Sequence, residues 1–179
     1  VQVIPSGSQE LVLREYMSDD KRSYFAVIER DGAALNLEAG DRPWLGRFDS
    51  RVVLAIPASY IGILNLSTVS GNIEMQSPWA FSQLHVSSVS GSIALASLTV
   101  ANLKVESVSG KIGLTEVFAQ MDLHSTSGTI EVANCRGPAK VITTSGKIEV
   151  SLDQLLGGLD LESTSGKIEL RIPQDAAYD

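Results

Sequence analysis

Apolar and polar residues alternate along most of this chain, in short runs that meet at a recurrent serine-glycine step. An isoleucine always stands second after the step, another apolar residue stands fourth, and two more stand seven and five positions before it. Alternation with a period of two predicts β-strands that bury one face, and helical spacing never develops. The isoleucines are Ile73, Ile93, Ile112, Ile130, Ile148 and Ile168.

The phrase around the step occurs six times, as TVSGNIEM, SVSGSIAL, SVSGKIGL, STSGTIEV, TTSGKIEV and STSGKIEL. The glycines of successive copies are 20, 19, 18, 18 and 20 residues apart. Self-similarity at a fixed period of this length indicates a solenoid, in which each repeat forms one coil and contacts only its neighbours. The glycines are Gly71, Gly91, Gly110, Gly128, Gly146 and Gly166.

A repeat of 18 to 20 residues is too short for the four strands of a propeller blade but suits one coil of a β-helix. Stacked coils place equivalent positions in columns, so the isoleucines form an apolar ladder that no single coil buries alone. We therefore predict an all-β, single-domain, right-handed β-solenoid. Residues 1–50 alternate only in pieces and are expected to form an N-terminal cap of β-strands, and residues 51–179 the coils.

We interpret the six glycines as structural turn residues. A Ser or Thr three positions before each glycine and a Ser directly before it are small, and they can hydrogen-bond to nearby backbone or to their counterparts in the next coil. Glycine permits either a positive φ or a close backbone approach at the bend. On this interpretation the motif specifies a corner and not a chemical step.

The many serines also suggest a nucleophilic enzyme, with His85 and His124 as candidate bases. Both histidines are expected to point outward from coils two apart, and no recognisable nucleophile motif surrounds any particular serine. A pair of glycosidase acids cannot be picked from a row of stacked glutamates either. We therefore predict that the chain is not an enzyme and that it has no catalytic residues and no cofactor.

Outward charges predict a candidate partner-binding strip on the strand that follows the corner. Glutamates recur three positions after the glycine and lysines one position after it, so both kinds of side chain share one face. The strip would bind a glycan, a protein or a cation, although no D-x-D loop supplies the oxygens that Ca²⁺ requires, and we predict no metal site. The alternative is a solvated, salt-bridged face. The glutamates assigned to binding are Glu131, Glu149 and Glu169.

Two tryptophans stand in loop-like insertions, Trp44 in GDRPWLGRF and Trp79 in QSPWAF. An exposed indole ring could stack on a sugar or insert into a partner, and Trp79 is therefore a further candidate binding residue. The alternative is that each ring covers the edge of the core.

Composition narrows the classes of partner. Of the 179 residues 44% are apolar, and the formal net charge of −7 is spread along the chain, which argues against a nucleic-acid partner. The single cysteine, Cys135, leaves no internal disulfide and no metal-ligand cluster. No run approaches the roughly 18 apolar residues that a transmembrane helix needs.

The repeated pattern, preceded by an Ile-Pro pair as in Ile56-Pro57, resembles the bacterial adhesin-like β-solenoid family, a domain of unknown function found in envelope-associated proteins. The resemblance covers about residues 48–178. It implies a β-solenoid without assigned catalytic residues, and it implies a place outside the cytoplasm or at the cell surface.

Pattern and resemblance together predict a non-enzymatic binding or scaffold module of the cell envelope, which presents flat β faces to a carbohydrate, peptide or protein. The alternative function is a self-associating β-helix polymer like the bactofilins. It rests on the repeat stopping where another coil would begin, because an uncapped coil exposes strand edges.

Overall fold

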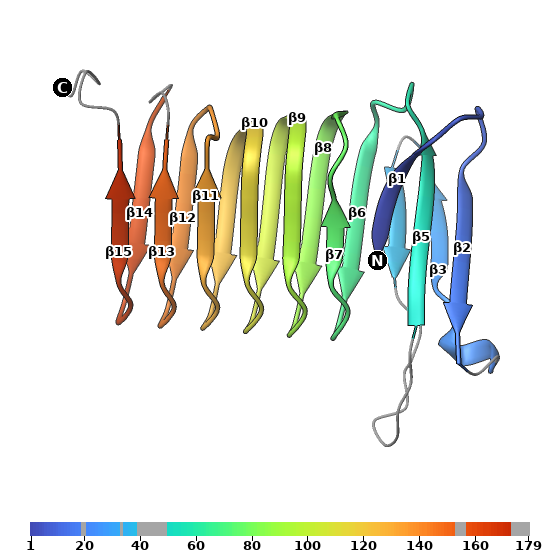
Figure 1. Ribbon diagram of the computed structural model, residues 1–179, viewed down its shortest axis with the longest axis horizontal. Coiled ribbons are helices and arrows are strands. Elements are labelled where there is room, and N and C mark those ends of the chain that lie inside the picture. The colour runs from blue at the N-terminus through green and yellow to red at the C-terminus, as the bar shows by residue number, and fades with distance from the viewer. Residues whose placement is uncertain (19–20, 33, 39–49, 153–156, 173–179) are drawn as a thin grey trace.

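The computed structural model describes residues 1–18, 21–32, 34–38, 50–152 and 157–172. Within them the chain is all-β apart from one short 3₁₀ turn, η1 (Arg22–Tyr24). The predicted β-solenoid is confirmed, because the strands wind into coils that stack along one axis (Figure 1). In the same residues no helix is long and apolar enough to cross a membrane.

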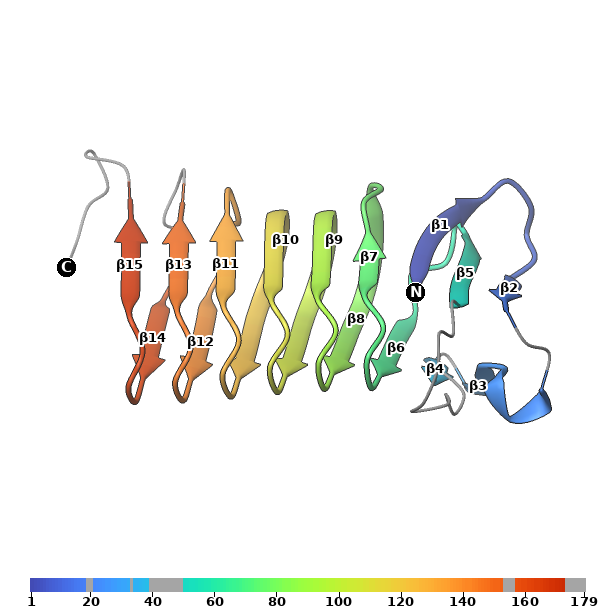
Figure 2. The same ribbon diagram turned by 60° about the horizontal axis from the view of Figure 1, so that its bottom comes forward.

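Each coil has one strand before the serine-glycine corner and one after it, and we call the two ladders of strands the entry face and the exit face (Figure 2). The entry face contains β4 (Ala34–Glu38), β6 (Ile63–Thr68), β12 (Ala139–Thr143) and β14 (Leu159–Ser163). The exit face contains β1 (Gln2–Ser6), β5 (Ser50–Pro57), β7 (Ile73–Met75), β11 (Ile130–Ala133), β13 (Ile148–Ser151) and β15 (Ile168–Arg171).

Three long strands in the middle of the molecule each cover more than one side of a coil, and two of them connect the two ladders. Of these, β8 (Trp79–Ser88) ends on the entry face, while β9 (Ile93–Ser107) and β10 (Ile112–Ser125) begin on the exit face and end on the entry face of the next coil. The bend within each strand forms a short third side of the coil. All these neighbours pair in parallel, as coils wound in one direction must.

The isoleucine ladder lies in the interior, as predicted. Parallel pairing matches each isoleucine of the motif with the isoleucine of the next coil, from Ile73 to Ile168. The first five are at most 1% exposed. Burying a side chain of this size contributes about 1.5–3 kcal/mol, so the column is a main source of stability.

The third side buries its own apolar residues, namely Trp79, Phe81, Leu98, Val100, Val117 and Ala119. The rings of Trp79 and Phe81 stack with their centroids 5.6 Å apart, and Trp79 is only 4% exposed. The expectation that Trp79 lies in a loop is therefore wrong, since it begins strand β8 and fills the core at its first rung.

The first strand of the chain becomes an internal rung. β1 lies between β5 and β7 and pairs in parallel with both, so that Val3 is matched with Leu54 on one side and Met75 on the other. Beyond it, β2 (Val12–Met17) pairs antiparallel with β5, and β3 (Val27–Asp31) pairs antiparallel with β4. The antiparallel strands β2 and β3 cover the N-terminal end, whereas β1 and β4, which also fall within the expected cap of residues 1–50, pair in parallel within the two ladders.

Two hydrogen-bond ladders hold the corners. Within each coil, the hydroxyl oxygen three positions before the glycine accepts a bond of 2.8–3.0 Å from the glycine amide. Between coils, the serine before the glycine donates its hydroxyl to a corner carbonyl of the preceding coil at 3.1–3.3 Å. The hydroxyls therefore bond to backbone, as the turn interpretation predicts.

The corner glycines are required by a close approach between coils and not by their own dihedral angles. The glycines with positive φ in the described residues are Gly32, Gly137 and Gly157, all outside the motif. A Cβ built on Gly110 would lie 2.0 Å from the carbonyl oxygen of Gly91, and one on Gly128 would lie 1.9 Å from that of Gly110. A methyl group cannot fit at these distances, so only glycine lets the corners stack.

We expect Gly110→Ala to destabilise the protein by about 2–3 kcal/mol or more, because a new Cβ would force adjacent corners apart. The matched control is Gly113→Ala, three residues later in β10, where the nearest heavy atom would lie at 3.8 Å. That change should stay within about 1 kcal/mol. Urea unfolding of both variants makes the comparison, and equal losses would show that corner contact does not determine stacking.

Candidate partner-binding surfaces

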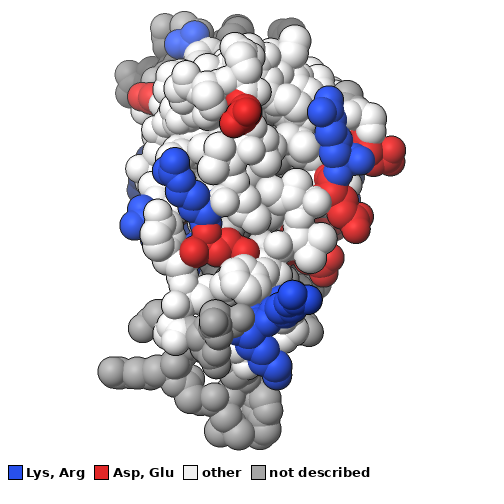
Figure 3. Space-filling view, turned by 90° about the vertical axis from the view of Figure 1, so that its right-hand side faces the viewer, with Lys and Arg blue, Asp and Glu red and all other residues white. Residues whose placement is uncertain are grey.

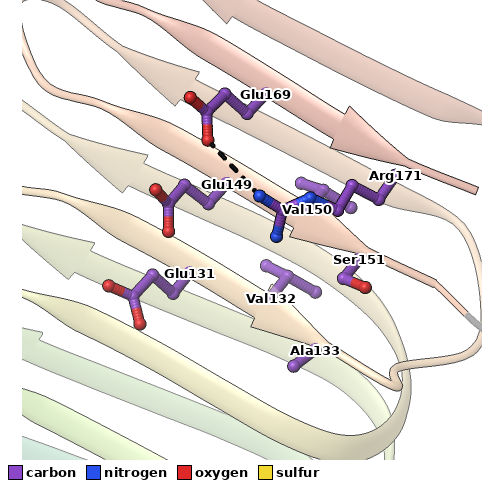
Figure 4. Close-up of a pocket in the computed structure, with 8 residues that line it drawn as sticks. All are labelled: Glu131, Val132, Ala133, Glu149, Val150, Ser151, Glu169 and Arg171. Atoms are coloured by element: carbon purple, nitrogen blue, oxygen red, sulfur yellow. Dashed lines mark ion pairs between the residues drawn. The ribbon is translucent and has the colours of Figure 1, made fainter.

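The predicted glutamate strip is assembled on the exit face. Glu131, Glu149 and Glu169 stand in register on β11, β13 and β15, each between two residues whose side chains point inward. Figure 4 shows the three carboxylates side by side along a shallow hollow of about 150 Å³, with the side chain of Arg171 extending toward Glu169. The hollow is an open surface feature between the outward columns.

Basic side chains form ion pairs with these carboxylates. Lys147 contacts both Glu149 and Glu169, Lys167 contacts Glu169, and the ammonium of Lys111 lies 2.6 Å from Glu131. The guanidinium of Arg171 lies 4.0 Å from Glu169. The strip is therefore the salt-bridged face of the alternative interpretation. Since such exposed pairs each contribute at most about 1 kcal/mol, a ligand could replace them at little cost.

One carboxylate of the strip is strongly perturbed. Hydrogen bonds from Lys167 and then Lys147 lower the pKa of Glu169 from 4.5 to about 2. The hydrogen bonds of Lys147 to Glu149 and Glu169 raise the pKa of the lysine in return. Both shifts favour the charged forms of Glu169 and Lys147.

The two histidines lie on the entry face, each beside a carboxylate. His85 Nε2 lies 2.9 Å from Glu106 Oε2, and Lys104 lies 3.0 Å from the other oxygen of the same carboxylate. Burial raises the pKa of Glu106, but the hydrogen bonds from His85 and Lys104 outweigh it and lower that pKa overall. His124 Nε2 lies 2.7 Å from Asp122 Oδ1. Glu106 stands beside His124 in register on the preceding coil, but its carboxylate contacts His85.

The histidines and carboxylates described above are not arranged as ligands of one metal ion. In the part of the chain that the structure describes, no three His, Cys, Asp or Glu side chains are placed to hold one ion. Cys135 is buried, and desolvation raises the pKa of its thiol, although hydrogen bonds with the backbone at Val117 and Ala133 lower it in part.

Trp79 is not available to a partner. Its ring is covered by the core, and its indole nitrogen is buried without a hydrogen-bond partner among the described residues. The assignment of Trp79 to partner binding is therefore wrong, because the residue sits at an inward position of β8. Trp44 lies outside the described residues.

Among the described residues of the coils, the large aromatic side chain that is exposed is Phe118, 42% exposed on the third side. The guanidinium carbon of Arg136 lies 5.0 Å from the centroid of its ring. Alternation could have indicated its outward position, since it stands between the inward residues Val117 and Ala119 in β10. No repeated motif marks the third side in the sequence, so Phe118 was not assigned to an exposed position.

A family model described as Toastrack DUF4097 matches residues 2–179, and the chain therefore belongs to this family, a domain of unknown function. The predicted resemblance to a β-solenoid family is confirmed at this level, whereas the adhesin role stays a prediction. Neither the curated proteins nor the solved structures contain a significant match to the chain.

The carboxyl of Glu169 should titrate near pH 2 in a pH series followed by carbon NMR. A lowered pKa stabilises the fold above the ordinary value of 4.5, and this contribution is lost as the pH falls toward 2. Lys167→Gln should move the pKa of Glu169 upward because it removes the largest cause of the shift. Lys140→Gln removes the same charge on the entry face and should leave it unchanged; equal titration in both variants would contradict the assignment.

Proposed function

For this Toastrack chain we propose the function of a non-enzymatic binding scaffold of the bacterial surface or envelope, whose flat β faces hold an extended carbohydrate, peptide or protein partner. In this function the interior and the corners build the shape of the protein, and the outward side chains contact the partner. No nucleic acid and no cofactor enter it.

The observation that carries the proposal is the contrast between inward and outward positions within the repeat. The inward position two residues after each glycine is isoleucine in all six coils, and it stays in register from coil to coil. The outward column six residues before the glycine varies in charge and size: Asn65, His85, Lys104, Asp122, Lys140 and Asp160. The shape is therefore repeated in every coil, while this outward column of the entry face changes from coil to coil, which suits a scaffold that displays side chains.

The exit-face strip is the part of this surface best suited to a long partner. Neighbouring coils bring one rung every ~4.8 Å, so its charged groups form a regular row. The carboxylates are held by lysines at the surface, where ion pairs exchange partners at little cost. A polymer with hydrogen-bond donors or charges along its length would meet several rungs at once, and several weak contacts add up.

Binding to the strip is tested with isolated cell-wall material, matrix glycans and a peptide panel, by pull-down followed by calorimetry. We expect saturable binding by the native chain and a loss of at least about tenfold in a triple Gln variant of Glu131, Glu149 and Glu169. The matched control changes Asp122, Asp160 and Glu162 on the entry face to Asn or Gln and should bind normally. No binding across the panel, or equal loss in both triple variants, would contradict the proposal.

A second candidate function, end-to-end self-association, is favoured by apolar side chains that are exposed on the last described rung. Ile168 and Leu170 of the last rung are 40% and 44% exposed, whereas the equivalent Ile148 and Val150 one coil earlier are 0% and 2% exposed. At the opposite end Figure 3 shows a mostly uncharged surface interrupted by several charged side chains. Unpaired strand edges with apolar side chains favour pairing with another chain.

Self-association predicts a mass that grows with concentration in light-scattering measurements. Ile168→Lys should abolish the growth, because a charge would stand in the joined interior. Ile61→Lys is the control, since Ile61 is 67% exposed on the connection between β5 and β6. A native mass that stays at 19.1 kDa over the whole range would rule out this second function.

A further inference from the structure

A polar hollow of about 370 Å³ lies on the third side of the coils, away from the glutamate strip. Three successive coils line it: Ser97 and Thr99 come from β9, Glu116 and Phe118 from β10, and Asn134 and Arg136 from the turn that follows β11. The volume is near the lower end of the ~300–1,000 Å³ typical of small-molecule sites. The hollow therefore suits a ligand unit of one or two rings.

Phe118 supplies an apolar surface at the hollow. Its ring is 42% exposed although its neighbours Val117 and Ala119 are buried, so the core does not account for the aromatic side chain. Thr99 is matched with it on the preceding coil and Arg136 on the next. The pairing of β9 with β10 shifts register directly after Phe118, an irregularity of the kind that redirects side chains beside binding sites.

A row of polar side chains borders the ring. Ser97, Glu116 and Asn134 hold equivalent places in their coils, and all three have positive φ, of 58°, 55° and 53°. This conformation is natural for asparagine but unfavourable for serine and glutamate. The hydroxyl of Ser97 donates a bond of 3.2 Å to Glu116 Oε2, which fixes the carboxylate beside the hollow.

The charges of the hollow balance. Glu116 offers acceptors, Arg136 offers donors, and the hydroxyls and the Asn134 amide offer both. Arg136 forms no ion pair among the described residues, and its guanidinium rests over the Phe118 ring. The carboxylate of Glu116 would repel an anion. A metal ion would find one carboxylate and the positive charge of Arg136 beside it, so neither kind of ion matches the hollow. A neutral molecule rich in hydroxyl groups satisfies every group present.

We propose that the hollow formed by Ser97, Thr99, Glu116, Phe118, Asn134 and Arg136 is a saccharide-binding site. One face of a sugar ring carries C–H groups that pack on an aromatic ring, while its hydroxyls bond to carboxylate, amide and guanidinium groups. The site rests on the proposed function of a binding scaffold and specifies a ligand class on a surface other than the exit-face strip.

The test titrates the folded chain with glucose, galactose, N-acetylglucosamine and their β-linked disaccharides, and follows amide shifts and saturation transfer by NMR. We expect at least one sugar to shift the amides of Thr99, Glu116, Phe118 and Asn134 in a saturable way. Phe118→Ala should weaken its Kd by about tenfold or more, and Phe118→Tyr should retain binding because the ring stays. Tyr16→Ala, at an exposed aromatic residue of the cap, should leave the Kd unchanged.

A second variant tests the site in case Phe118→Ala loses its folded structure. Thr99→Trp fills the hollow from the exposed side of β9 and should abolish binding while the amide spectrum stays that of a folded chain. The proposal is overturned if no sugar shifts these amides, or if folded Phe118→Ala and Thr99→Trp bind as well as the native chain. If sugars fail here while the exit-face strip still binds a partner, this site falls and the proposed function stands; failure at both surfaces removes both.

Discussion

The stacking of this protein depends on the contact between the backbone of one corner and the backbone of the next. Strands in neighbouring coils must lie about 4.8 Å apart to share hydrogen bonds, and the corner has to turn within the same spacing. At Gly146 and Gly166 a Cβ would stand 1.9 Å and 1.6 Å from the carbonyl oxygen one coil earlier. The missing side chain therefore permits the spacing at which every ladder, apolar or polar, can form.

Hydroxyl groups complete what the glycine permits. The hydroxyl oxygen of Ser107 accepts a hydrogen bond from the amide of Gly110. This side-chain bond takes the place of a backbone bond across the corner. Because Ser109 donates to the carbonyl of Val89, the same corner is tied to the coil before it. The isoleucines build the interior, and the serines and glycines build the corners. The outward positions carry charged side chains such as Glu149 and the ring of Phe118. The proposed recognition and the stability of the fold thus depend on different positions of the same strand.

The N-terminal strand shows why a repeat pattern describes the middle of a solenoid better than its ends. β1 pairs with β5 and β7 at once, although it carries no copy of the serine-glycine motif that would predict an internal rung. Trp79 was misplaced for a related reason, since its flanking QSP suggested a loop while the neighbouring coil required a buried side chain there. The Phe118 hollow arises from three coils, and no single copy of the repeat contains it.

The sequence by itself determined the fold class, the coil length, the inward isoleucines and the corner. Each of these follows from periods of two and of 18 to 20 residues, and a period is a local property of the chain. It also indicated that lysines and glutamates share a face. Only the tertiary structure decided which corner constraint applies, which aromatic ring is exposed, and which cation meets which carboxylate. These depend on distances between coils, and such distances exist only after the coils have stacked.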